Sequence, residues 1–518
     1  GLRRARVELC GDRPCARSLL RTEVEGESWR SPTRLSPGVV FWHVQGLDDA
    51  GGVAWTSATW EFLVRHADTP TDTAYRPLHD FDGDGFDDVV TQVYLSFYNR
   101  GTLQLYRGAA AGLESLPSAE LHSPEADMPG RTPSFAESVE VGDVNGDGFA
   151  DLLVGEPRTP AGGAATLHGR ALVYLGSSGG LQPEAPQRVV VALDRARSDM
   201  GVEGIADRLG VIDFNGDGFE DLAVSRETNP PDTTLPALYL LLGDARGVTP
   251  LPTSTLTPTV GTSYWFSLQG VGDVNGDGYG DLAFVRQLER DIKAVALLYG
   301  NPMGRLDARI EYLTRPYGAP FGERIAGGDF NGDTFSDFLV SGYGGFNLVR
   351  GGSEGIEWAP NPRPPEPMLG ATSSFSFGSL LNIQGDLDGD GIGDLATGGY
   401  CESFYPTATF WCHQGVVFLY PGVWSAILPT WSRYLLGNHE DDDGFKEAAV
   451  PGDLNADGVD DLVVGAALAR VPDAGTTPPD GAILGALHVY RGGTWDWERP
   501  TMSVRATQAA FRIGYRVY

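Results

Sequence analysis

Short runs of mostly apolar residues recur along the chain, and Gly, Asp, Asn or Pro separate one run from the next. Residues 135–143 (FAESVEVGD) and 151–156 (DLLVGE) are two such runs, and RALVYLG and QRVVVAL follow them. Runs of this length, with alternating or continuous apolar positions, predict β-strands. The four runs therefore predict one four-stranded unit.

The same order of runs returns about every 60 residues, with a poorer fourth strand in the fifth unit. Seventy Gly and 35 Pro are scattered without a strict period, which favours many short elements joined by tight turns. No apolar run approaches the ~18 residues that a membrane-spanning helix needs. The pattern predicts a repeated, all-β protein without a transmembrane segment.

An Asp-rich loop of the form D-x-[DN]-x-D-x-x-x-D occurs once in each unit. The seven copies begin at Asp80, Asp143, Asp213, Asp273, Asp329, Asp386 and Asp453, at spacings of 63, 70, 60, 56, 57 and 67 residues. Self-similarity at such a period is typical of repeat architectures. The loop and its strands therefore belong to one structural repeat.

The residue types in the loop point to a hard divalent cation. Positions 1, 3, 5 and 9 carry Asp or Asn oxygens, position 7 can offer its backbone carbonyl, and position 6 is Gly in six copies. Calcium suits such an all-oxygen, partly flexible set better than magnesium does. The predicted ligands are Asp80, Asp82, Asp84, Phe86 and Asp88; Asp143, Asn145, Asp147, Phe149 and Asp151; Asp213, Asn215, Asp217, Phe219 and Asp221; Asp273, Asn275, Asp277, Tyr279 and Asp281; Asp329, Asn331, Asp333, Phe335 and Asp337; Asp386, Asp388, Asp390, Ile392 and Asp394; and Asp453, Asn455, Asp457, Val459 and Asp461.

The EF-hand is excluded, because it needs Glu at position 12 and flanking helices, whereas position 12 here is Thr, Val or Phe. Asp-rich turns without an ion are the alternative, which seven copies of one ligand pattern disfavour. Two copies depart from the pattern: Thr334 replaces Gly at position 6 of the fifth loop, and Ala456 replaces Gly at position 4 of the seventh. Because a β-branched residue tolerates positive φ poorly, the site at Asp329–Asp337 is expected to be the weakest.

The formal net charge of −31 disfavours nucleic acid and anionic membranes as partners. The four oxygen positions of the seven loops hold 23 carboxylates, a third of all Asp and Glu. Seven Ca²⁺ ions would add fourteen positive charges and bring the formal charge to −17. Much of the acidity is therefore explained by the predicted calcium sites.

Four cysteines form two local pairs, Cys10 with Cys15 and Cys401 with Cys412. Even, local pairing favours disulfides and an oxidising compartment, and four free buried thiols are the alternative. The chain opens on Gly1, which indicates a processed or trimmed N-terminus, and Lys occurs only at 293 and 446, a bias typical of a GC-rich bacterium. These features predict an exported bacterial protein, extracellular or on the cell surface.

A β-only period of about 60 residues fits one blade of a β-propeller, and seven units predict a seven-bladed ring over residues 69–518. The sequence resembles the FG-GAP repeat of integrin α-subunit propellers and their bacterial relatives: FG stands at 321–322 and 377–378, and GAP is blurred to GEP at 155–157. The resemblance implies calcium in the loop between the first and second strands of each blade. The last residues, AFRIGYRVY, either add a strand to the first blade as a clasp, which we favour, or begin an eighth blade.

Residues 1–68 differ from the repeats. LSPGVVFWHVQG followed by SATWEFLVR resembles the last strands of a fibronectin type III-like sandwich, of which earlier strands are missing. The alternatives are a fragment of a longer protein, strands supplied by a partner, or a short β appendage on the propeller.

No catalytic constellation is found. The string Gly176–Gly180 fits G-x-S-x-G, but it falls at a turn between the third and fourth strands, where a nucleophile at Ser178 lacks the strand-to-helix context. Calcium is expected to be structural, with binding on the opposite face, in the long loops 156–170, 226–237, 286–294, 399–415 and 467–485. The candidate partner-binding residues are Tyr264, Trp265, Phe404, Tyr405, Phe410 and Trp411.

The sequence thus predicts a secreted or surface protein that binds a protein or glycan partner through this face. A structural subunit that contacts neighbouring copies through residues 1–68 is the first alternative. A polysaccharide- or lipid-acting enzyme of the propeller type is the second, which the scarcity of Lys and the acidic surface disfavour.

Overall fold

The computed structural model is all-β. It describes residues 4–11, 15–24, 29–33, 35, 38–48, 51–57, 59–64, 79–94, 101–124, 135–160, 167–184, 186–189, 204–227, 237–257, 265–289, 292–314, 321–333, 335–342, 345–358, 375–390, 392–401, 415–422, 433–436, 445–467, 485–493, 497, 499–505 and 512–518. Within these ranges there are 37 strands and no helix. The predicted all-β class is confirmed.

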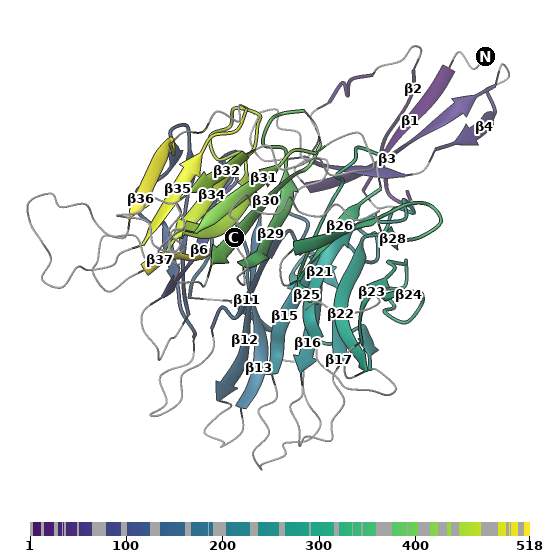
Figure 1. Ribbon diagram of the computed structural model, residues 1–518. Helices are drawn as coiled ribbons and strands as arrows, with labels where there is room; N and C mark the ends of the chain where they lie inside the picture. Colours follow the sequence, from purple (N-terminus) through teal and green to yellow (C-terminus); the bar gives the residue numbers. More distant parts are fainter. Residues whose placement is uncertain are drawn as a thin grey trace, which may run out of the picture.

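The N-terminal strands form one antiparallel sheet in the order β2-β1-β3-β4, and β5 also pairs with β3. The strands are β1 (Arg4–Cys10), β2 (Ser18–Val24), β3 (Gly38–Leu47), β4 (Val53–Thr56) and β5 (Trp60–Val64). Figure 1 shows this sheet, in purple, at one side of the molecule, outside the group of later sheets. The strand predictions around LSPGVVFWHVQG and SATWEFLVR are confirmed as β3 and β5, while the fibronectin type III-like assignment stays a prediction.

Seven four-stranded antiparallel sheets follow; six of them have the strand order of one predicted unit, and the first includes the C-terminal strand. They are β37 (Arg512–Val517), β6 (Val89–Tyr94), β7 (Thr102–Tyr106) and β10 (Ala119–Leu121); β11 (Ser138–Gly142), β12 (Asp151–Pro160), β13 (Leu167–Tyr174) and β14 (Gln187–Val189); β15 (Gly204–Ile212), β16 (Asp221–Glu227), β17 (Ala237–Leu241) and β20 (Ser254–Leu256); β21 (Trp265–Gly272), β22 (Asp281–Glu289), β23 (Ile292–Leu298) and β24 (Ile310–Thr314); β25 (Phe321–Gly328), β26 (Asp337–Gly342), β27 (Gly345–Arg350) and β28 (Glu357–Trp358); β29 (Phe375–Gly385), β30 (Asp394–Cys401), β31 (Val416–Tyr420) and β32 (Arg433–Leu436); and β33 (Phe445–Gly452), β34 (Asp461–Ala466), β35 (Ala486–Tyr490) and β36 (Met502–Arg505). Two short ribbons, β8 (Gly108–Ala109) with β9 (Gly112–Leu113) and β18 (Gly243–Asp244) with β19 (Gly247–Val248), lie at third-to-fourth-strand turns.

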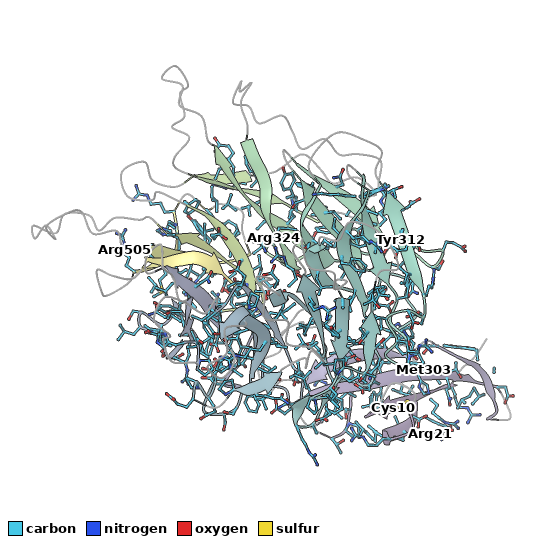
Figure 2. All side chains as sticks on the ribbon, turned by 90° about the horizontal axis from the view of Figure 1, so that it is seen from below. Cys10, Arg21, Met303, Tyr312, Arg324 and Arg505 are labelled. Carbon is cyan, nitrogen blue, oxygen red and sulfur yellow. A yellow bond between two sulfur atoms is a disulfide. The ribbon has the colours of Figure 1, made fainter. Side chains whose placement is uncertain are left out.

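Each sheet packs against the next through a buried apolar cluster. The second and third sheets share one such cluster, in which Leu153 and Val173 meet Leu222 and Val224. Further clusters join the other consecutive pairs, and one of them joins the seventh sheet to the first. Because every sheet has a neighbour on both faces, its middle strands need apolar residues on both faces, which explains continuous runs such as DLLVGE. Figure 2 shows the sheets arranged side by side around a middle region near the label of Arg324.

The C-terminal strand completes the first sheet. Strand β37 pairs antiparallel with β6, and the N–H groups of Tyr518 and Val90 each donate to the other's carbonyl, at N···O distances of 2.9 and 3.2 Å. The predicted clasp is confirmed. The position at the start of that sheet, before β6, belongs to β37.

One predicted disulfide is present. Cys10 and Cys15 are bonded, with their Cα atoms 5.1 Å apart, and the bond closes the hairpin between β1 and β2. Cys412 lies outside the described residues, so the pairing of Cys401 with Cys412 stays a prediction.

Candidate metal centre

Each Asp-rich loop directly precedes the second strand of its sheet. In sheets two to seven the loop joins the first strand to the second, as between β11 and β12, and in the first sheet residues 80–88 lead into β6. The strand framework therefore places the seven loops at equivalent positions.

The carboxylate at the first position organises the loop around itself. Asp80 accepts hydrogen bonds from the backbone N–H groups of Gly83 and Asp84 at Oδ1, and from that of Gly85 at Oδ2, at 2.7, 3.2 and 2.9 Å. The chain can wrap so tightly because Gly83 and Gly85 have φ angles of 73° and 91°. Equivalent bonds recur in the other loops, for example at Asp213.

Ala456 holds the same backbone shape without glycine. It stands at position 4 of the seventh loop with φ 57°, in the left-handed region that L side chains rarely adopt. The seventh loop therefore carries local backbone strain that its neighbours avoid. Thr334, the basis for expecting a weak fifth site, lies outside the described residues.

The Asp at position 9 is buried in all seven loops, with at most 1% of its surface exposed. In the second loop, Asp151 Oδ2 accepts the N–H of Val144 at 2.9 Å and Oδ1 accepts the N–H of Gly176 at 2.8 Å. Gly176 belongs to the turn after the third strand, so this carboxylate joins two neighbouring turns of one sheet. Sequence reasoning assigned the residue only as a ligand and missed this second role.

The loops also gather carboxylates. Ligand atoms of Asp80, Asp82 and Asp88 all lie within 4.8 Å of one another, and those of Asp386, Asp388 and Asp394 do the same. These two sets come from the two loops that have Asp rather than Asn at position 3. An oxygen-only set of this size fits a hard divalent cation.

Burial raises the pKa of these carboxyl groups. Desolvation is the largest cause for Asp80 and Asp143, whose pKa values rise to about 6, and repulsion from neighbouring loop carboxylates adds to it. The pKa of Asp394 rises to about 8 for the same reasons, and that of Asp151 rises well above its ordinary value. Backbone N–H groups oppose the rise but do not cancel it. Buried, mutually repelling carboxylates are the groups that a bound cation would stabilise.

A backbone hydrogen bond joins each loop to its neighbour. The N–H at position 8 of one loop donates to the position-1 carbonyl of the preceding loop, as from Ala150 to Asp80 at 2.9 Å. The other six bonds run from Glu220 to Asp143, Gly280 to Asp213, Ser336 to Asp273, Gly393 to Asp329, Asp460 to Asp386 and, from the first loop to the last, Asp87 to Asp453. The seven loops are thus linked in a circle.

Three position-8 side chains add a second bond across the same junctions. Asp87 accepts the N–H of Asp453 at 2.9 Å, and Asp460 accepts that of Asp386 at 2.8 Å. Glu220 accepts the N–H of Asp143 at 2.6 Å. Position 8 varies in sequence, so no repeated signal pointed to it.

The remaining sequence predictions are placed as follows. Ser177 and Gly180 form a turn after β13, where Ser177 N–H donates to the Phe81 carbonyl, so the G-x-S-x-G string is a turn, as predicted. Among the candidate partner-binding residues, Trp265 begins β21. Tyr264, Phe404, Tyr405, Phe410 and Trp411 lie outside the described residues.

Comparison with known proteins identifies the repeat. Residues 80–154 and 213–284 match the family model described as FG-GAP-like repeat. Integrin alpha-IIb of Mus musculus is 35% identical over 159 residues, 29% of this chain and 14% of the integrin. Integrin alpha-V of Gallus gallus is 26% identical over 310 residues, 53% of this chain and 27% of the integrin, and integrin alpha-7 of Homo sapiens is 30% identical over 293 residues, 54% and 23%.

The chain therefore contains FG-GAP repeats of the integrin alpha type. It covers between 14% and 27% of the length of these three relatives. Among the described residues, no helix is long and apolar enough to cross a membrane.

Proposed function

We propose that this protein is an extracellular adhesion or recognition module, a seven-bladed β-propeller whose Asp-rich loops bind Ca²⁺ for stability. The circle of seven loops, joined at every junction by the position-8 hydrogen bond, is the observation that carries the proposal. The apolar cluster between the seventh sheet and the first supports a closed ring. Similarity to integrin alpha chains supports the recognition role.

The cation would be held by the loop oxygens, and it would supply positive charge among buried carboxylates. The donor set is carboxylate, amide and carbonyl oxygen, which favours Ca²⁺ over softer metals. Backbone N–H groups already hold the carboxylates at positions 1 and 9, so these oxygens are positioned before a cation binds. The cation therefore acts on stability in this proposal, and takes no part in a reaction.

The recognition surface would then be the face opposite the loops. On the loop side, the described turns are short and tied to neighbouring sheets by backbone hydrogen bonds, as Ser177 is to Phe81 and Asn301 to Phe214. Such turns have little freedom to adapt to a partner. The longer connections of the other side, with Trp411 and its aromatic neighbours, supply the candidate contacts for a protein or glycan.

Two measurements test the proposal. Metal analysis after dialysis against Ca²⁺ is expected to find up to seven ions per chain, and a chelator is expected to lower the melting temperature. Binding to a glycan array and to candidate proteins is expected to require the intact fold and to fall with Trp411→Ala. Trp60→Ala is the control, because Trp60 is 45% exposed on the N-terminal sheet. Equal binding by both variants would remove the proposed face from consideration.

A structural subunit remains a second candidate, because the N-terminal sheet has an exposed edge. All four residues of β4 are exposed, and Trp55 is 47% exposed beside Gly46. An unprotected edge strand can pair with a strand of another chain. A concentration-dependent oligomer that Trp55→Lys abolishes would favour this role.

A further inference from the structure

One basic side chain lies directly against the first loop. Arg107 Nε is 2.9 Å from Asp82 Oδ2, and Asp82 is the position-3 residue of that loop. The Asp82 side chain is only 6% exposed, whereas that of Arg107 is 36% exposed. The pair therefore lies at the margin of the loop, with the carboxylate inside and the guanidinium towards solvent.

The position of Arg107 in the repeat is fixed by its neighbour. Gly108 donates its N–H to Asp88 Oδ1 at 2.9 Å, so the residue after the third strand is always close to the loop of its own sheet. The equivalent glycine of the sixth sheet, Gly422, bonds to Asp394 in the same way, and the residue before it is Pro421. The sixth loop has the same four carboxylates, but proline provides no guanidinium at this place.

Arginine also occupies the equivalent position in the fifth and seventh sheets, as Arg350 and Arg491. Position 3 of the fifth and seventh loops is Asn331 and Asn455, respectively, and neither side chain offers a carboxylate to the arginine. Arg491 Nη2 instead donates to the carbonyl of Ala110 at 3.1 Å. Among the described residues, the pairing of this arginine with an acidic third position is specific to the first loop.

The geometry leaves the loop able to hold a cation. Asp82 uses Oδ2 for Arg107, while its Oδ1 faces the loop and accepts the N–H of Asp84 at 3.2 Å. One carboxylate can thus lie between a guanidinium and a cation. When only the four ligand carboxylates and Arg107 are counted, the first site has a net formal charge of −3, the same as a site with three ligand carboxylates.

We propose that Arg107 is a built-in counter-ion of the first loop, which stabilises that loop when no cation is bound and lowers its affinity for Ca²⁺. This inference rests on the proposed cation binding. In the ion-free state the guanidinium offsets repulsion among Asp80, Asp82, Asp84 and Asp88. When Ca²⁺ is bound, the guanidinium repels the cation. Both effects reduce the free energy by which Ca²⁺ stabilises the first loop.

The test is hydrogen–deuterium exchange of the whole chain, followed by mass spectrometry while Ca²⁺ is titrated at low ionic strength. Peptides that cover 80–88 and 386–394 report on the first and sixth loops separately. Arg107→Ala is expected to lower the Ca²⁺ concentration for half-protection of the first loop about sevenfold, as for a unit charge roughly 7 Å from a divalent ion in near-aqueous screening. In chelator, the same variant is expected to exchange faster in the first loop.

Control variants separate charge from packing. Arg107→Lys keeps the charge and is expected to keep the midpoint within about twofold, and Arg305→Ala removes an exposed arginine that pairs with Asp307. In the Asp82→Asn background, Arg107→Ala is expected to shift the midpoint less, because Asp82 no longer holds the guanidinium beside the loop. If Arg107→Ala fails to fold, Arg107→Gln replaces it.

A first-loop midpoint that stays within twofold or rises in Arg107→Ala, while other loops respond to Ca²⁺, would overturn the counter-ion role alone. If no loop gains protection with Ca²⁺, cation binding itself is refuted, and the counter-ion role with it. The two failures are therefore distinguishable in one data set.

Discussion

The second loop offers a matched pair of substitutions that separates architecture from cation binding. Asp151 is fully buried and accepts the N–H groups of Val144 and Gly176. Asp147 is partly exposed and accepts the N–H of Phe149 at 3.0 Å. Both are predicted ligands, but only Asp151 joins two turns of the sheet.

The expected loss of folding free energy in each variant follows from those contacts. In Asp151→Ala, two buried N–H groups lose their acceptor, at about 1–3 kcal/mol each. Removal of a buried carboxyl group with a raised pKa offsets part of this, which leaves about 3 kcal/mol. Asp147→Ala loses partly exposed bonds and is expected to cost roughly 1 kcal/mol without a cation.

Thermal unfolding in chelator and in Ca²⁺ measures both variants. If the chain of 518 residues unfolds as one unit, with an entropy of about 2.1 cal/mol/K per residue, 3 kcal/mol lowers the melting temperature by roughly 3 °C. In chelator, Asp151→Ala is expected to melt clearly below the wild type and Asp147→Ala close to it. In Ca²⁺, Asp147→Ala is also expected to melt below the wild type, because one loop has lost a ligand. Equal melting of the two variants in chelator would refute the architectural role of position 9.

Three further predictions concern titration and closure. In chelator, the melting temperature is expected to fall as pH rises from about 4 to about 8. The cause is that folded Asp80 and Asp394, with pKa values of about 6 and 8, keep protons that the unfolded chain releases. In Ca²⁺, the same series of melts is expected to lose this trend. Glu140→Gln is expected to leave melting unchanged near pH 4 and to raise it progressively as pH rises from about 5 to about 8, because burial raises the pKa of Glu140 to about 8 and the substitution preserves an oxygen for Gln269. Deletion of 512–518 is expected to lower the melting temperature and to speed amide exchange in β6, whereas unchanged exchange there would contradict the clasp.

Much of the fold could be predicted because its information is local. A period-two apolar pattern specifies a strand, and the Asp and Gly spacing specifies a loop whose carboxylate collects N–H groups a few residues away, as Asp80 does. The pairing of β37 with β6 was also accessible, since AFRIGYRVY is a strand pattern without a partner nearby in sequence. Local rules of this kind need no knowledge of neighbouring sheets.

The contacts between sheets could not be predicted in the same way. Glu220 meets Asp143 across 77 positions, and Asp87 meets Asp453 across 366. Position 8 is Asp, Ala, Glu, Gly or Ser in different loops, because its backbone N–H makes the common bond and its side chain is free to vary. Arg107 was missed for a related reason: its partner Asp82 is 25 residues away, and its repeat position holds Leu, Tyr or Pro in four of the other six sheets.

These contacts also refine what cation removal should do. Position 9 is held by backbone N–H groups of its own sheet, and position 8 holds the preceding loop, and neither bond involves a cation. Without Ca²⁺, the loop carboxylates, position 9 included, are expected to repel one another, while the circle of hydrogen bonds and the apolar clusters between sheets persist. Chelation should then raise amide exchange in the loops before it loosens strands such as β12, so the cation stabilises an architecture that the chain already forms.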